Sequence, residues 1–193
     1  TEEAGQPTQM DQTPWRAKSD HYITRGVPLD AFPWGQISVA AAQSSGETLL
    51  ETSQGAPVLA VRELGKGRIV AFAYRERGMI PEIAKVFETG LHYPYQEYLW
   101  SLVARAVVWA AKREPQAAIQ KLEWADGRVI ATIKDAPADS VLTAAIRNGF
   151  AETEPEISAA ATDKVSLTIP KPLTGGRHFA DARLLAEGRA LDW

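Results

Sequence analysis

The sequence lacks cysteine altogether in its 193 residues. Disulfides, thiolate metal sites and cysteine nucleophiles are therefore excluded together. Histidine is scarce as well, and the spacing of His21, His92 and His178 matches no metal-binding motif. Long apolar runs are also missing, since none approaches the roughly 20 residues that a transmembrane helix needs. We therefore expect no metal, no cofactor and no membrane span.

An excess of positive charge is absent too. The chain has 21 basic and 24 acidic residues, which gives a formal net charge of −3. The basic residues are scattered, whereas a surface that follows a phosphate backbone needs them clustered. Nucleic acid is therefore not an expected partner. The lack of cysteine leaves the compartment open, because many periplasmic and secreted bacterial domains also lack it, and a periplasmic or extracellular location is favoured.

Apolar residues make up 45% of the chain, enough for a substantial core. Residues 1–20 are polar and without periodicity, so we expect a flexible lead-in that packs only at Trp15. Between residues 21 and 115 the pattern predicts four strands and a helix. The expected strands cover residues 36–43, 48–52, 58–61 and 69–74. A glycine-containing hairpin at Leu64–Gly67 should join the last two, because glycine tolerates positive φ.

The helix is expected from about Tyr95 to Lys112. Apolar residues recur in it at helical spacing, and Pro115 follows as a stop signal. Strands closed by such a helix predict the last part of an α/β layer over residues 21–115. The residues on the predicted apolar face are Leu99, Leu102, Val103, Ala106, Val107 and Ala110.

Residues 118–193 have a different pattern. Short segments alternate between apolar and polar residues, and turn signals such as Asp126-Gly127 and Glu187-Gly188 separate them. The expected strands cover residues 119–124, 128–134, 140–146, 164–169, 178–185 and 189–193. This spacing predicts a second domain, an all-β sandwich of the immunoglobulin-like type.

Four segments together resemble the C-terminal portion of a class I glutamine-amidotransferase-like domain. They are His21–Gly26, Ala56–Val61, Gly65–Phe72 and the tryptophan-rich helix. The resemblance covers roughly residues 20–114 and implies a flavodoxin-like sheet. Degenerate domains of this family occur in large bacterial multidomain proteins, often beside β-sandwich modules and sometimes with carbohydrate-active enzymes.

Active members of that family need a cysteine nucleophile and a His–Glu pair that activates it. This chain has no cysteine, and the strand expected at 69–74 is followed by Arg75–Glu82, which contains no histidine. The resemblance therefore implies a degenerate, non-catalytic domain. We assign no catalytic residue and do not expect this chain to be an enzyme by itself.

The most interesting local cluster precedes the helix and comprises His92, Tyr93, Tyr95 and Glu97. The free N–H groups and dipole of a helix N-terminus favour anions, so this cluster could form the rim of a pocket for a polar ligand or a sugar. Alternatively, Tyr95 and Tyr98 cover the sheet and Glu97 caps the helix.

Two further candidates, Arg75 and Arg77, follow an expected strand at its carboxyl end. Ligands bind at that edge of open α/β sheets. The other interpretation is that both arginines belong to a solvated loop. Gly65-Lys66-Gly67-Arg68 does not fit a phosphate-binding loop, because the required pattern and the following helix are both missing.

Taken together, the sequence predicts a non-catalytic accessory or scaffold region of a larger bacterial protein associated with polysaccharide processing. The expected partners are other domains of the same polypeptide and carbohydrate. The start at Thr1, without an initiator methionine, also suggests a piece of a longer chain. Two alternatives stay open: a ligand-binding or carbohydrate-binding module that uses the Tyr93–Glu97 rim, and a fragment of an enzyme whose catalytic residues lie elsewhere.

Overall fold

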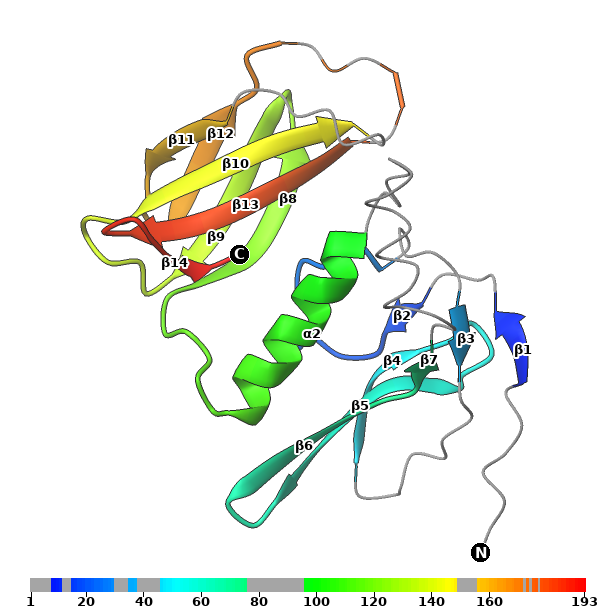
Figure 1. The fold of residues 1–193 in the computed structure, drawn as a ribbon. Coiled ribbons are helices and arrows are strands. Elements are labelled where there is room, and N and C mark those ends of the chain that lie inside the picture. The colour runs from blue at the N-terminus through cyan, green and yellow to red at the C-terminus, as the bar shows by residue number, and fades with distance from the viewer. Residues whose placement is uncertain are drawn as a thin grey trace, which may run out of the picture. The chain divides into compact units, whose positions relative to one another are not determined.

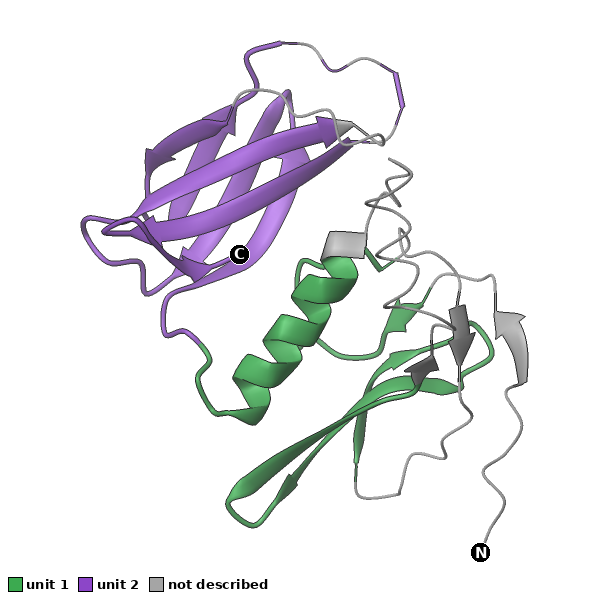
Figure 2. Ribbon diagram, viewed as in Figure 1, with its two compact units in different colours: residues 1–114 green, residues 115–193 purple. Residues whose placement is uncertain are grey.

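The structure is a computed structural model. It forms two compact units, unit 1 at residues 1–114 and unit 2 at residues 115–193 (Figure 2). The described residues are 8–11, 15–29, 35–37, 46–75, 96–148, 156–171, 173, 175–176 and 178–193. Among them, no helix combines the length and the apolar character that a membrane span requires.

The described strands of unit 1 form two antiparallel sheets (Figure 1). The larger sheet has the order β2-β4-β5-β6 and comprises Arg16–Ala17, Glu47–Glu51, Pro57–Leu64 and Gly67–Phe72. The smaller sheet has the order β1-β3-β7 and comprises Thr8–Asp11, Gly35–Ile37 and Tyr74–Arg75. Every pairing between these strands is antiparallel.

The hairpin between β5 and β6 confirms the turn predicted at Leu64–Gly67. Leu64 pairs with Gly67, which leaves Gly65 and Lys66 as a two-residue turn. Gly65 has φ 57°, as the first central residue of a type II′ turn requires. A side chain at this position would be strained, so the glycine directly determines where the chain reverses.

Helix α2, Gln96–Ala110, packs against the larger sheet. Leu99, Leu102 and Trp109 are buried in one cluster with Leu59 of β5 and other apolar residues of unit 1. Val107 was expected on the same apolar face, but its side chain is 64% exposed. The reason is helical geometry, because Val107 lies about 140° around the helix from Leu102.

The predicted α/β, flavodoxin-like architecture is wrong. More than half of the described residues lie in strands, the described strands pair antiparallel, and α2 is a helix of only 15 residues rather than a long covering helix. A flavodoxin-like sheet is parallel, and each parallel connection needs a crossover of a dozen or more residues. The β4–β5 and β5–β6 connections span only residues 52–56 and 65–66, which is too short for any crossover.

Unit 2 has seven described strands in two antiparallel sheets. One sheet has the order β12-β9-β8 and the other β11-β10-β13-β14 (Figure 1). Their inner faces share one hydrophobic core, to which Val129, Leu142 and Leu184 contribute fully buried side chains. This is a β-sandwich arrangement. The strands are β8 Ala118–Ala125, β9 Arg128–Lys134, β10 Val141–Asn148, β11 Ile157–Ala160, β12 Lys164–Thr168, β13 His178–Ala186 and β14 Arg189–Asp192.

The strands and turns of unit 2 follow the sequence pattern closely. In β9 buried and less buried residues alternate, and Val129, Ala131 and Ile133 point into the core. Both central residues of the Asp126-Gly127 and Glu187-Gly188 turns have positive φ, as type I′ hairpins require. Strand β11 was not predicted. It is short, and its Ile-Ser-Ala-Ala sequence has little β-propensity apart from the isoleucine.

Candidate functional site

The candidate site is an apolar groove in unit 1, between the β5–β6 hairpin and α2. Its volume is about 230 Å³. The sheet contributes Leu59, Val70 and Phe72, and the helix contributes Leu102, Val103, Ala106, Val107 and Ala110. All these side chains are apolar.

The register of the hairpin explains the sheet side of the groove. Leu59 pairs with Phe72, and Val61 pairs with Val70, so these residues share one face of the sheet. Side chains alternate between the two faces along β6, so Ile69 lies on the opposite face of the sheet, where its side chain is 46% exposed. The sheet therefore presents a row of apolar side chains toward α2.

Small residues shape the helix side of the groove. Ala106 and Ala110 are four residues apart and lie on one face of α2. Their small side chains leave room between the helix and the sheet. Val103 and Val107, also four residues apart, line the groove next to them. The exposed position of Val107 places apolar surface where a bound group could cover it.

The lining limits what the groove can do chemically. Sites for sugars and for catalysis need polar groups that fix a ligand or move protons, in addition to apolar surface. The residues that line this groove supply no side-chain donor, acceptor or titratable group. They suit an apolar group such as the side chains of a peptide segment.

A polar cluster joins the β5–β6 hairpin to the end of α2. Arg68 of β6 lies over the Trp109 ring, donates to the Trp109 backbone carbonyl at 2.9 Å, and pairs with Glu63 and Glu114. Desolvation favours the neutral form of Arg68. The hydrogen bonds with Glu114 and Glu63 outweigh it and raise the pKa of the guanidinium above its ordinary value. The cluster is therefore a structural tie with Arg68 charged.

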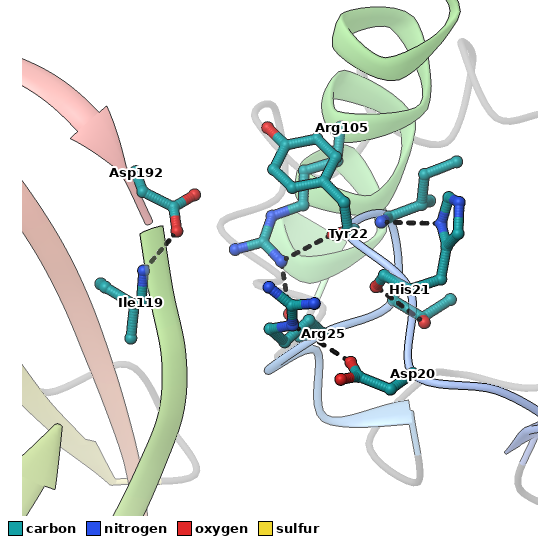
Figure 3. Close-up of polar contacts among 9 residues, drawn as sticks. Asp20, His21, Tyr22, Arg25, Arg105, Ile119 and Asp192 are labelled. Atoms are coloured by element: carbon teal, nitrogen blue, oxygen red, sulfur yellow. Dashed lines mark hydrogen bonds and ion pairs between the residues drawn. The ribbon is translucent and has the colours of Figure 1, made fainter. Parts of the chain in front are cut away.

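A second polar tie holds the turn at residues 21–26 against α2 (Figure 3). The buried Arg105 of α2 donates hydrogen bonds to the backbone carbonyls of Tyr22 and Arg25. Its guanidinium also lies 5.6 Å from the centroid of the Tyr22 ring. The carbonyl oxygens of Tyr22 and Arg25 therefore accept hydrogen bonds from a charged donor, and such hydrogen bonds are strong.

His21 belongs to the same turn. Its ring meets the Trp109 ring edge to face, with 5.4 Å between the centroids. Burial lowers the pKa of His21 below its ordinary value of 6.5, and Arg25 and Arg68 act in the same direction, whereas Glu47 and Glu114 oppose it. His21 is accordingly neutral at pH 7. It accepts a hydrogen bond instead of serving as a cation.

The side chains of the ligand-binding residues predicted from the sequence lie outside the described part of the structure. Arg77, His92, Tyr93 and Tyr95 lie outside the described residues. Arg75 ends β7 and Glu97 lies in the first turn of α2, but the side chains of both lie outside the described part. The proposed rim of a polar or sugar pocket therefore stays a prediction.

Metal ligation has no support in the described part of the chain, where no three acidic, histidine or cysteine side chains gather as a metal would require. Sequence reasoning missed the groove, although it placed all five helix residues that line it on the predicted apolar face. The pattern at Val103, Ala106, Val107 and Ala110 is the pattern of an ordinary core face. Only the pairing of hairpin and helix shows that part of this face stays open.

The chain matches no protein-family model, and no curated protein is significantly similar to it.

Proposed function

We propose that this chain is a non-catalytic accessory module, and that the groove of unit 1 docks an apolar peptide segment of a partner protein or domain. The observation that carries this proposal is the purely apolar lining of the groove between β5–β6 and α2. Docking of a peptide needs apolar surface and few polar groups, because the buried area drives it.

The exposure of the groove residues supports the same function. Val107, which lines the groove, is 64% exposed. Apolar surface of this kind costs free energy in water, and covering it with a partner recovers that free energy.

The test uses photo-crosslinking in the cells that produce the protein. A benzophenone amino acid replaces Val107 at the groove in one variant and Ile69 on the opposite face of β6 in a matched variant. We expect position 107 to be joined to one defined, apolar peptide of a partner, which mass spectrometry identifies. Equal labelling from both positions, or no peptide adduct at position 107, would refute the proposal.

A second measurement asks whether the groove itself is the binding surface. The dye 8-anilinonaphthalene-1-sulfonate becomes fluorescent in apolar grooves and serves as the probe. Val107→Glu should strongly weaken dye binding because it places a charge in the groove, whereas Ile69→Glu should leave binding unchanged. Equal loss in both variants would mean that the dye does not report on this groove.

We propose further that unit 2 is an immunoglobulin-like spacer module. Strand order supports this assignment. In seven-stranded domains of that type, the first, second and fifth strands share one sheet and the third, sixth and seventh share the other. Unit 2 has β8, β9 and β12 in one sheet and β10, β13 and β14 in the other. Its fourth strand, β11, pairs with β10, so it joins the second sheet instead of the first.

Two other predictions from the sequence have no part in this proposal. The resemblance to the amidotransferase family stays a prediction, but the flavodoxin-like sheet that it implied is not the fold of unit 1. A connection with polysaccharide processing rests on that resemblance alone. The groove proposal does not depend on either.

A further inference from the structure

We propose that the turn at residues 21–26 is a pH-sensitive clasp, which holds this segment on α2 while His21 is neutral and loosens when His21 is protonated. The clasp is defined as residues 21–26. The inference is independent of the groove and of the partner proposed for it.

The clasp depends on His21 as a hydrogen-bond acceptor. The backbone N–H of Ile23 donates to Nδ1 of His21, with 3.2 Å between the nitrogens. The proton of the neutral ring is therefore on Nε2. Protonation adds a hydrogen to Nδ1, which then cannot accept, and the Ile23 N–H loses its partner.

Other contacts of the clasp show what this hydrogen bond stabilises. The Thr24 and Arg25 amides donate to the His21 carbonyl at 3.0 and 2.9 Å, which closes the turn. Arg105 then binds the carbonyls of Tyr22 and Arg25 from α2 (Figure 3). The Ile23 side chain is fully buried in the core of unit 1. Loosening the turn therefore weakens both the packing of Ile23 in the core and the hydrogen bonds between the clasp and Arg105 of α2.

The charges around His21 come from several elements. Glu47 on β4 and Glu114 beyond α2 attract a proton, while Arg25 in the clasp and Arg68 on β6 repel it. Arg105 on α2 brings a further positive charge to the carbonyls of the clasp. The Trp109 ring contacts the His21 ring and His21 is half-buried, so an imidazolium there would be partly removed from water. Burial, together with Arg25 and Arg68, outweighs the two carboxylates and lowers the pKa of His21 below 6.5, so His21 is neutral near pH 7.

The test is an NMR titration of the full chain between pH 7.5 and pH 5. It follows the His21 ring signals and, by hydrogen exchange, the protection factors of the backbone amides. We expect the protection of Ile23 to fall about fivefold as His21 becomes protonated, the change expected for loss of one ordinary hydrogen bond. Amides in the middle of α2 should keep their protection.

His21→Asn provides the matched variant, because an asparagine oxygen can accept the Ile23 N–H and does not titrate in this range. It should remove the pH dependence of Ile23 protection, and His178→Gln, in unit 2, should preserve it. If His21→Asn does not fold, the wild-type titration alone decides.

Three results would overturn the proposal. The first is titration of His21 without a change at Ile23. The second is loss of protection throughout unit 1 at once, which would indicate global unfolding rather than a clasp. The third is an unchanged pH dependence at Ile23 in folded His21→Asn.

Discussion

The guanidinium of Arg68 lies over the indole of Trp109, with Cζ 4.6 Å from the ring centroid, and donates to the backbone carbonyl of the same residue. One side chain of the β5–β6 hairpin therefore binds both the ring and the main chain at the end of α2. Arg68 also pairs with Glu63 across the hairpin and with Glu114 after the helix. This contact ties the hairpin to the helix, next to the residues that line the groove.

Replacing Arg68 should destabilise unit 1. Arg68→Ala removes the cation–π contact and a charged hydrogen bond to a carbonyl, which together predict a loss of about 2 kcal/mol in the free energy of unfolding. Urea denaturation of the full chain, followed by tryptophan fluorescence, measures it. Lys66→Ala, at the exposed tip of the same hairpin, is the control and should be nearly neutral. Equal stability of the two variants would contradict the structural role of Arg68.

Asp192 should be important for the stability of unit 2. Its Oδ2 accepts the backbone N–H of Ile119 at 2.8 Å, which joins β14 of one sheet to β8 of the other (Figure 3). Asp192→Ala leaves that N–H without its acceptor and should cost about 2 kcal/mol.

Thermal unfolding, followed by circular dichroism, tests this prediction. Asp192→Asn retains a side-chain oxygen and should be less harmful than Asp192→Ala. Asp139→Ala removes an exposed carboxylate of the same unit and serves as the control for charge. If both alanine variants melt at the same temperature, the link between the sheets contributes nothing measurable.

The β13–β14 hairpin can be stabilised by one substitution. Glu187 has φ 48° in its type I′ turn, a conformation that asparagine tolerates much better than glutamate. Glu187→Asn should raise the free energy of unfolding by about 0.5 kcal/mol. Glu187→Gln changes the charge but keeps the backbone strain, and it should have no such effect. A melting temperature raised equally by both variants would point to charge as the cause.

The stability of unit 1 should fall in mildly acidic solution because of His21. Burial lowers the pKa of His21 in the folded state below the ordinary 6.5. Below pH 6.5 the unfolded chain therefore binds more protons than the folded chain, and stability decreases as the pH falls toward the folded-state pKa. Above pH 6.5 the contribution of His21 is complete.

Urea midpoints at pH 7.5 and pH 5.5 measure this effect. Carboxylates also titrate at low pH, so the decisive quantity is the difference between wild type and His21→Asn. We expect that difference to change between the two pH values. A constant difference would mean that His21 binds protons equally in both states.

Features that depend on neighbouring residues could be predicted from the sequence. Gly65, Asp126-Gly127 and Glu187-Gly188 mark hairpin turns because few residues tolerate positive φ. Strand β9 follows from strict alternation, and the second unit is a β-sandwich, as its short alternating segments predicted. Strand β11 escaped prediction because its short, alanine-rich sequence resembles a loop.

Features that depend on residues far apart in the sequence could not be predicted from it. The hairpin at Leu64–Gly67 makes β5 and β6 antiparallel, whereas the pairings of β2 with β4 and of β3 with β1 and β7 join segments that are far apart in the sequence. Val103 and Val107 belong to the predicted apolar face, yet Val107 lies about 140° around the helix from the buried Leu102, and both valines line the open groove.

The sequence by itself determined the absence of cysteine chemistry, the positions of the hairpin turns and the alternating strands of unit 2. Backbone sterics and side-chain periodicity act over a few residues, so a short stretch of sequence is enough to determine these features. The tertiary structure decided the strand order of the sheets of unit 1, the open groove and the contacts of His21 and Arg68 with Trp109. Those features require contacts between side chains of separate elements, and such contacts depend on the packing of the whole unit.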